Sequence, residues 1–407
     1  MNLTRYDLSA WAAIAAYAGG SVVLPVAMVE LARDLGFALG DGGMGAAGGL
    51  HMVRTVTVTA AMLACGLLAT RWGKRPAVGL SAVLMAAGLL ACAAAPGYGV
   101  LLVALGVAGL GEGGVEALAT PYVEALHPPP EEPGRYINLT HSFWSVGVVV
   151  AVLGAGALLA GGVSWRVPVA LTALAAVVAA AWVLWPAAPG KAYPETPAGG
   201  GAGGAFEEAA ALSRSGRFWL FFAAMGLAGG GEFCLTFWVA SFIQLELTGT
   251  ETSAWMAGVG TACFAGGMFV GRAGSGFLVG DHRLRTLLLA SAAAGAVLAA
   301  AVPFTASLGV LLPLLGAAGL ATAPFWPSTQ SLAARRLRRA DPTTLFVLLS
   351  CAGVPGCGVA TWAMGLLGDG FGLRAAFFLV PACFLGLGLL LAVEALLPER
   401  ASPDPDA

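Results

Sequence analysis

The sequence predicts an all-α membrane protein in which twelve transmembrane helices form two six-helix, pseudo-symmetric bundles. Composition is the first reason: 58% of the 407 residues are hydrophobic and only 10% are charged, whereas soluble domains carry about 25% charged residues. The second reason is that apolar stretches of about 20 residues, enough to cross about 30 Å of hydrocarbon, follow one another with short polar breaks. The third is a likeness between the two halves of the chain.

Apolar runs give six spans in a first bundle, residues 1–187, and six in a second, residues 217–407. The first six lie at 10–32, 44–69, 76–95, 99–126, 136–160 and 165–187. The second six lie at 217–243, 253–279, 286–304, 308–333, 343–367 and 373–397. Residues 188–216 are rich in glycine and polar residues and are predicted to form a flexible cytoplasmic linker.

The distribution of Lys and Arg predicts the orientation. With both termini in the cytoplasm, fifteen of these residues lie on the inner side and three, Arg33, Arg166 and Arg374, on the outer side. This bias agrees with the positive-inside rule. The last two, Arg54 and Arg272, fall within the membrane.

The two halves match each other at an offset of about 210 residues. Residues 18–21 match 229–232, residues 66–69 match 276–279, and residues 165–166 match 373–374. Because six is an even number, both copies enter the membrane from the same side. They should therefore be parallel repeats about an axis along the membrane normal, with any binding site at their interface near the midplane.

Several classes of function are disfavoured by the sequence. A net charge of -2 does not suit nucleic-acid binding, which needs clustered basic surface. No phosphate-binding Gly-x-x-x-x-Gly-Lys-[Ser/Thr] motif occurs, and the seven cysteines do not form the close pairs of a metal or redox site. We therefore expect no enzyme activity, no metal, no cofactor and no nucleic-acid partner.

Three carboxylates inside predicted spans are candidates for carrying a proton. Glu116 lies mid-span among small residues, where an ionised carboxylate is costly unless it is protonated, paired or hydrated. Glu112 lies one turn earlier on the same face, and Glu232 follows a cluster of three glycines. The alternative for each is a structural hydrogen bond between helices. For Glu116 proton transfer is favoured, and for Glu112 proton transfer and a structural hydrogen bond are equally favoured.

Other polar and aromatic residues inside the spans are candidates for binding a solute. Arg54 shares a stripe with His51, and its guanidinium suits either an anionic solute group or pairing with Glu116 or Glu112. Arg272 has the same two alternatives, with a structural contact to Glu232 or to a helix-capping carbonyl favoured. The remaining candidates, for which packing is the alternative, are Asn138, His141, Trp144, Trp238, Trp326 and Gln330. Aromatic rings among them would stack on the apolar face of a sugar.

The segment that follows the second span reads GLLATRWGKR over residues 66–75. It resembles the signature loop of the major facilitator superfamily, with Thr70 where the family usually has an acidic residue. The resemblance implies the major facilitator fold. It also implies a gating role for this loop, with Gly66, Arg71, Gly73, Lys74 and Arg75 as its candidate residues.

Further segments resemble the fucose-galactose-glucose proton symporter branch of that family, namely residues 111–123, 135–147, 231–232 with Trp238, 271–272 and 323–327. The resemblance implies proton-coupled uptake of a sugar or sugar-like solute by alternating access, and it gives the Glu116 position a role in proton transfer or sugar contact. The chain departs from the branch at Ser21, where a proton-linked carboxylate is usual, and at His141 and Trp144, where amides are usual.

These observations predict a secondary active transporter driven by a proton gradient. The alternatives are a proton-coupled exporter of drugs or metabolites and a transporter of an anionic solute such as a sugar acid or sugar phosphate. We expect a multi-pass monomer in the lipid bilayer of the bacterial inner membrane.

Overall fold

A computed structural model of the protein describes residues 3–127, 133–186, 192–194, 202–247, 253–278, 283–337 and 342–397. The first half of the chain contains the helices α1 (Arg5–Asp34), α2 (Met44–Trp72), α3 (Lys74–Ala93), α4 (Tyr98–Leu126), α5 (Pro133–Ala160) and α6 (Arg166–Leu184), with a short 3-10 turn η1 (Leu39–Asp41). All regular secondary structure in the described ranges is helical, so the all-α prediction is confirmed.

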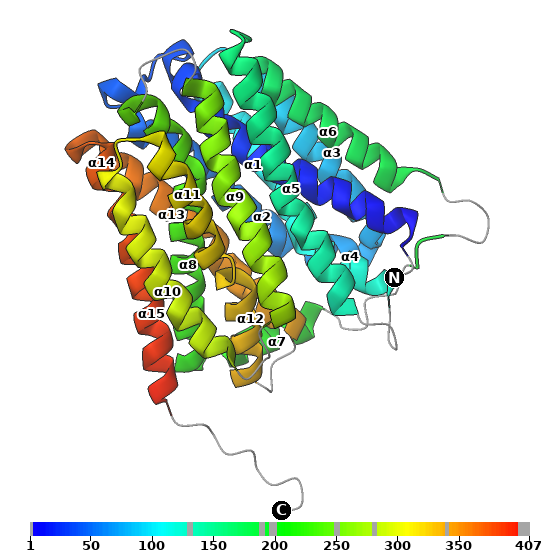
Figure 1. Ribbon diagram of the computed structural model, residues 1–407. Coiled ribbons are helices and arrows are strands. Elements are labelled where there is room, and N and C mark those ends of the chain that lie inside the picture. Colours follow the sequence, from blue (N-terminus) through cyan, green and yellow to red (C-terminus); the bar gives the residue numbers. More distant parts are fainter. Residues whose placement is uncertain are drawn as a thin grey trace, which may run out of the picture.

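The second half contains α8 (Gly216–Phe242), which continues as the π-helical segment η2 (Ile243–Leu247), and α9 (Ser253–Leu278). They are followed by α10 (Leu284–Ala301), η4 (Val302–Phe304), α11 (Leu308–Thr322), α12 (Phe325–Arg336), α13 (Pro342–Phe371), α14 (Leu373–Ala376) and α15 (Leu379–Leu396). Both halves are drawn in Figure 1, with the first half to the right and the second to the left.

Eleven stretches within the described ranges are long and apolar enough to cross a membrane. They correspond to eleven of the twelve predicted spans. The twelfth predicted span corresponds to α2, a helix of 29 residues that carries His51 and Arg54. Because α2 packs between α4 and α13 inside the bundle, its polar residues are shielded from lipid.

Two predicted spans are divided in the structure. The span predicted at 308–333 breaks between α11 and α12 at Ala323 and Pro324, because proline has no amide hydrogen and disfavours helical geometry in the residue before it. The last predicted span consists of the short α14 followed by α15. By contrast, Gly229, Gly230 and Gly231 lie within an unbroken α8.

The interval 188–216 contains a helix that the sequence does not predict, α7 (Ala202–Ser213). It packs against α8 and α13, and its Leu212 belongs to the buried core. Upstream of α7, Tyr193 is buried against the first half, where its hydroxyl donates to the Tyr122 carbonyl at 2.8 Å and its ring stacks on that of Tyr122. Each half therefore binds part of the segment that joins them.

The two halves meet mainly along two helix pairs, α2 with α13 and α5 with α9, and α1 also contacts α8; α5 and α9 run side by side in Figure 1. We call the end of the bundle that holds Arg5, Gly73 and Leu396 the terminal end. The opposite end, with η1, Gly162 and Gly372, is the far end.

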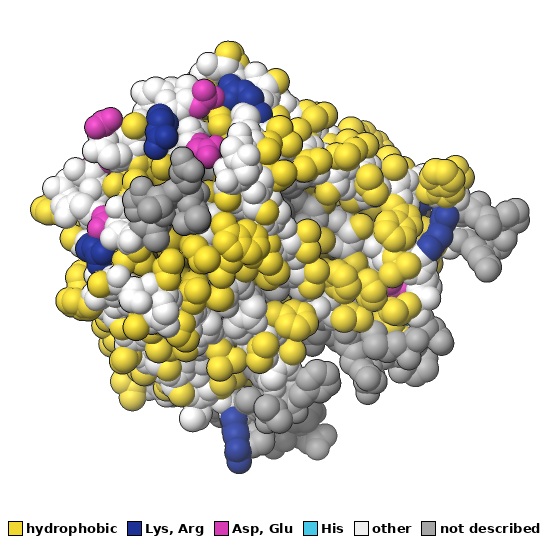
Figure 2. Space-filling model, turned by 45° about the horizontal axis from the view of Figure 1, so that its top comes forward, with side chains coloured by type: hydrophobic (Ala, Val, Ile, Leu, Met, Phe, Trp, Pro, Cys, Tyr) yellow, Lys and Arg dark blue, Asp and Glu magenta, His cyan; other side chains and the backbone are white. Residues whose placement is uncertain are grey.

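Apolar side chains cover most of the face shown in Figure 2, while charged side chains gather at its margins. Large aliphatic residues on several helices are more than half exposed, for example Val103, Val150, Val297 and Leu389. A soluble protein rarely exposes a continuous apolar surface of this extent. Such a surface is the one expected for contact with lipid.

Glycines allow the helices around the interior to pack closely. A Cβ atom on Gly113 of α4 would lie 2.2 Å from the Val58 carbonyl oxygen of α2, and one on Gly111 would lie 2.2 Å from the Met85 amide of α3. Gly267 and Gly271 pack in the same way against α11, as small residues four apart on a membrane helix commonly do. The glycines therefore fix where the polar residues of α4 and α9 face.

We expect Gly113→Leu to destabilise the protein, because the new side chain has no room between α4 and α2. Overpacking of this kind costs about 1–3 kcal/mol, which a thermal melt in detergent would detect as a lower Tm. The control is Gly154→Leu on α5, where a Cβ atom meets nothing within 4 Å. Equal Tm values for the two variants would contradict the prediction.

Candidate functional site

The first polar group of the interior centres on Arg54 of α2. Its Nε lies 2.6 Å from Oε2 of Glu112 on α4, and its Nη2 donates to Oγ of Ser21 on α1 at 2.6 Å. The side chains of Arg54 and Glu112 are 6% and 0% exposed. The predicted contact between Arg54 and a carboxylate of α4 is thus confirmed for Glu112, and the charge of Arg54 is neutralised within the first half.

His51 connects this group to the second half. Its Nδ1 lies 3.5 Å from Nη1 of Arg54, and its ring stacks on Phe233 of α8 with centroids 4.3 Å apart and planes 6° apart. Phe237, one turn further along α8, lies 5.4 Å from the same ring. We call Arg54, Glu112, Ser21 and His51 the Arg54 cluster.

The second polar group centres on Arg272 of α9. Its Nη2 lies 3.0 Å from Oε1 of Glu232 on α8, and its Nε donates to the Ala323 carbonyl at 3.4 Å, where α11 breaks. Its guanidinium carbon also lies 5.6 Å from the ring centroid of Trp144 on α5 of the other half, within the range of a cation–π contact. The predicted structural contacts of Arg272 with Glu232 and with a helix-capping carbonyl are confirmed. Arg272, Glu232 and Trp144 form the Arg272 cluster.

Glu116 of α4 lies between the two clusters. It is partly exposed, and Arg272 acts on it electrostatically across the interface. Within the described part of the chain, its carboxylate forms no hydrogen bond or ion pair. Glu116 therefore differs from Glu112 and Glu232, each of which holds an arginine.

Tyr17 of α1 is a further member of this region that the sequence analysis missed. Its hydroxyl lies close enough to Arg54, Glu112 and Glu116 to be influenced by their charges, and Cys357 of α13 is a further neighbour. The signal available in the sequence was its spacing of four residues from Ser21, whose Oγ donates to the Tyr17 carbonyl. Phe233 was missed as well, because an aromatic residue in an apolar span carries no distinguishing pattern.

Several other candidates surround the same region. His141 Nε2 lies 3.0 Å from Oγ1 of Thr120, which joins α5 to α4. Trp326 of α12 packs against Val58 and Val354, which belong to opposite halves. Gln330 lies further along α12 and donates to Oγ of Ser350 at 3.1 Å within the second half.

One candidate from the sequence is not brought to this region. Trp238 is completely buried, and its indole nitrogen donates to the Thr361 carbonyl at 3.1 Å. It therefore packs inside the second half, because the i+6 spacing from Glu232 turns its side chain about 120° around α8 from that carboxylate. Asn138 belongs to α5, but its side chain lies outside the described residues, as do the surroundings of Gly66 on α2.

The predicted gating loop is mostly helical. α2 extends through Arg71 to Trp72, and Gly73, with a φ of 87°, makes the turn into α3, which starts at Lys74. Arg75 donates to the carbonyls of Val183, Leu184 and Trp185 at the end of α6. These three contacts lie within the first half. Gly73 is a glycine for a local reason, since a positive φ is unfavourable for other residues.

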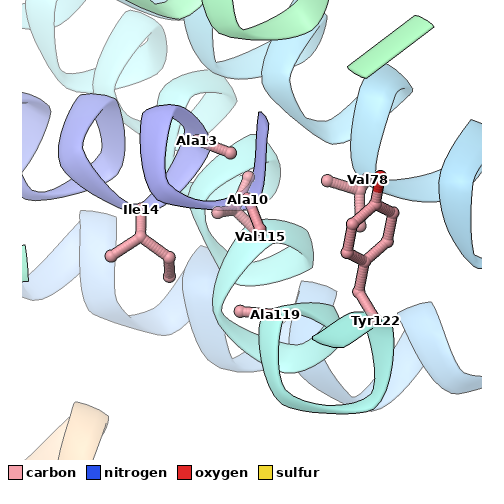
Figure 3. A pocket seen from close by; sticks show the side chains of 7 residues that line it. All are labelled: Ala10, Ala13, Ile14, Val78, Val115, Ala119 and Tyr122. Atoms are coloured by element: carbon pink, nitrogen blue, oxygen red, sulfur yellow. The ribbon is translucent and has the colours of Figure 1, made fainter. Parts of the chain in front are cut away.

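The cavity shown in Figure 3 does not belong to this region. Aliphatic side chains of α1, α3 and α4 point into it together with Tyr122, and its volume is about 10 Å³. A space of this size holds at most one water molecule, so it is a packing void. A larger hollow of about 440 Å³ lies at the far end, lined by residues of the segment from Arg33 to Ala46, which joins α1 to α2.

The chemistry available in the interior is proton transfer and hydrogen bonding. Of its five charged side chains, two arginines and two carboxylates form pairs, which leaves Glu116 as the carboxylate without a partner in the described structure. Among the described residues, no cluster of three His, Cys, Asp or Glu side chains has the arrangement of a metal site.

Comparisons with known proteins agree with the architecture. Residues 10–284 match the model of the Major Facilitator Superfamily, while no curated protein sequence matches significantly. The fold is similar to that of the Escherichia coli fucose:proton symporter, with 17% identity, 96% of this chain and 99% of the other covered, and a TM-score of 0.63.

Two further structures are similar at a TM-score of 0.73 each. One is a bacterial homologue of the human lysosomal transporter Spinster, with 16% identity over 99% of this chain and 100% of the other. The other is the xylose transporter XylE from E. coli, with 14% identity over 98% of this chain and 99% of the other. The family match covers well over half of the chain and the fold agrees along its length, so this multi-pass membrane protein belongs to the Major Facilitator Superfamily of transporters.

Proposed function

We propose that the protein is a proton-coupled transporter of a neutral, sugar-like solute, which it moves by alternating access between its two halves. The observation that carries the proposal is the state of Glu116, which stands at the interface without a partner among the described residues, whereas Arg54 and Arg272 each pair with another carboxylate. An uncompensated carboxylate in a membrane interior is unfavourable when ionised. Proton uptake by Glu116 would remove that cost.

The same balance of charges favours a neutral solute over an anionic one. Arg54 and Arg272 are held by Glu112 and Glu232, so an anionic solute would have to displace one of these carboxylates or accept a proton. Trp144 and Trp326 offer aromatic faces, and Tyr17 and His141 offer polar groups, as a sugar requires. The sugar specificities of two structural neighbours, named as a fucose:proton symporter and a xylose transporter, add support.

The positive-inside bias supports an orientation with the terminal end in the cytoplasm and the far end outside. In a bacterium this corresponds to the inner membrane with both termini cytoplasmic. A proton gradient directed inward would then drive uptake. The monomer and the absence of a cofactor remain expectations from the sequence.

Reconstituted vesicles test the proposal. With an acidic exterior, we expect accumulation of at least one radiolabelled neutral monosaccharide from a panel, and a protonophore should abolish it. The same panel should contain sugar acids, sugar phosphates and typical exporter substrates. Accumulation of a sugar acid or phosphate in place of neutral sugars would contradict the neutral-solute assignment, and drug extrusion without sugar uptake would favour the export alternative.

A further inference from the structure

The far ends of α2 and α13 are joined by a contact that crosses the interface between the halves. Asp369, near the end of α13, accepts two backbone hydrogen bonds from the start of α2. Its Oδ1 lies 2.9 Å from the Met44 nitrogen, and its Oδ2 lies 2.7 Å from the Gly45 nitrogen. α2 thus receives its N-terminal cap from the opposite half of the protein.

α2 has no cap of its own. The residue before the helix is Gly43, which has no side chain, and no side-chain hydrogen bond caps the helix from its own N-cap position. The first amides of a helix lack partners inside the helix, and the N-terminus carries partial positive charge. A carboxylate at this place therefore satisfies both the amides and the helix dipole.

Small residues bring the two backbones close enough for this contact. A Cβ on Gly48 of α2 would lie 2.7 Å from Cα of Trp362, and a Cβ on Gly365 of α13 would lie 2.3 Å from the Met44 carbonyl oxygen. A second close approach at the far half of the interface joins Gly156 of α5 to Gly258 of α9. These contacts require the far ends of the halves to be together, so the cap exists only while the far end is closed.

We propose that Asp369 is a latch that holds the far end closed by capping α2 across the interface. Opening of the far end separates Asp369 from Met44 and Gly45 and leaves both amides to water. Because Asp369 is exposed, water compensates part of the loss. The latch therefore biases the balance between closed and open states without locking it.

Thiol labelling tests the latch without any solute, so its outcome is independent of the proposed sugar specificity. The background has all seven native cysteines replaced. Thr55→Cys is added on α2, where the side chain is buried against Gly358 of α13. A membrane-impermeant maleimide is applied to intact cells and, separately, to inverted vesicles, so that the result does not depend on which end faces outward.

The rate at which Thr55→Cys is labelled from the far side measures the fraction of molecules whose far end is open. We expect Asp369→Ala to raise it about 2- to 30-fold, the range that loss of an N-cap produces in an equilibrium constant. Asp369→Asn, which keeps one acceptor oxygen, should give a smaller increase.

The matched control is Asp34→Asn. Asp34 also lies at the far end, where it pairs with Arg166 at 2.6 Å, but both residues belong to the first half. Its replacement should leave the labelling rate unchanged. Rates equal to the parent in both Asp369 variants, each shown to be folded by size-exclusion chromatography, would overturn the latch, as would an equal increase in the Asp34 control.

Discussion

Replacing Glu116 with Gln is expected to abolish uphill accumulation driven by a pH gradient while solute binding and exchange persist. Gln resembles the protonated carboxyl in size and hydrogen bonding, but it cannot release a proton. The solute should then equilibrate to equal concentrations on both sides of the membrane. Reconstituted vesicles with an imposed pH gradient measure this directly, and counterflow of labelled solute measures the exchange that should remain.

Uptake by the wild type should fall as the external pH rises. A carrier that loads with Glu116 protonated should lose uptake as the external pH rises, because fewer molecules hold the proton when the far end is open. Exchange by the Gln variant should no longer vary with pH through this residue. Wild-type accumulation by Glu116→Gln would reject the assignment.

Two further variants test whether proton coupling depends on Glu116 or on another carboxylate. Glu124→Gln lies on the same helix, α4, at an exposed position, and it should accumulate solute like the wild type. Glu232→Gln removes a carboxylate that already holds Arg272. If only the Glu232 variant lost accumulation, the coupling site would move to α8.

The second large effect is expected at Arg54 and Glu112. Glu112→Leu leaves the buried guanidinium of Arg54 without a counter-charge, because Ser21 supplies only a neutral hydroxyl. Removing one partner of a buried ion pair costs about 3–5 kcal/mol. We expect a marked fall in the free energy of unfolding of the detergent-solubilised protein, measured by denaturant titration.

The double variant Arg54→Leu with Glu112→Leu should recover most of this loss, because no unpaired charge remains. Ser21→Ala is the milder control, since it removes one hydrogen bond to a charged group, a change of about 1.5–3 kcal/mol. A Glu112→Leu protein as stable as the wild type would show that Arg54 reaches water or another carboxylate. If a stable double variant still transports solute, the pair has a packing role. If a stable double variant no longer transports solute, Arg54 takes part in solute binding.

Hydropathy alone determined the class of the protein and most of its helices, since a chain of this composition satisfies its backbone in lipid only through helices or closed barrels. The even number of spans and the repeat between Ser21 and Glu232 predicted two parallel halves. Local chemistry also identified the charged residues of the interior as candidates, because a charge within a membrane span is costly wherever the span packs. Arg54, Glu112, Glu116, Glu232 and Arg272 were all found in this way.

Only the tertiary structure decided between the partners that the sequence left open, such as Glu112 or Glu116 for Arg54. Pairing depends on the rotation and separation of neighbouring helices, and these follow from packing at sites such as Gly113 and Gly267, whose partners lie far away in the sequence. In the packed structure Arg54 pairs with Glu112, and Glu116 has no partner among the described residues, although both carboxylates share one face of α4. The cap that Asp369 provides for α2 could not be predicted from the sequence either. A carboxylate at the end of one helix can cap another helix only when the fold brings the free amides of that helix to it.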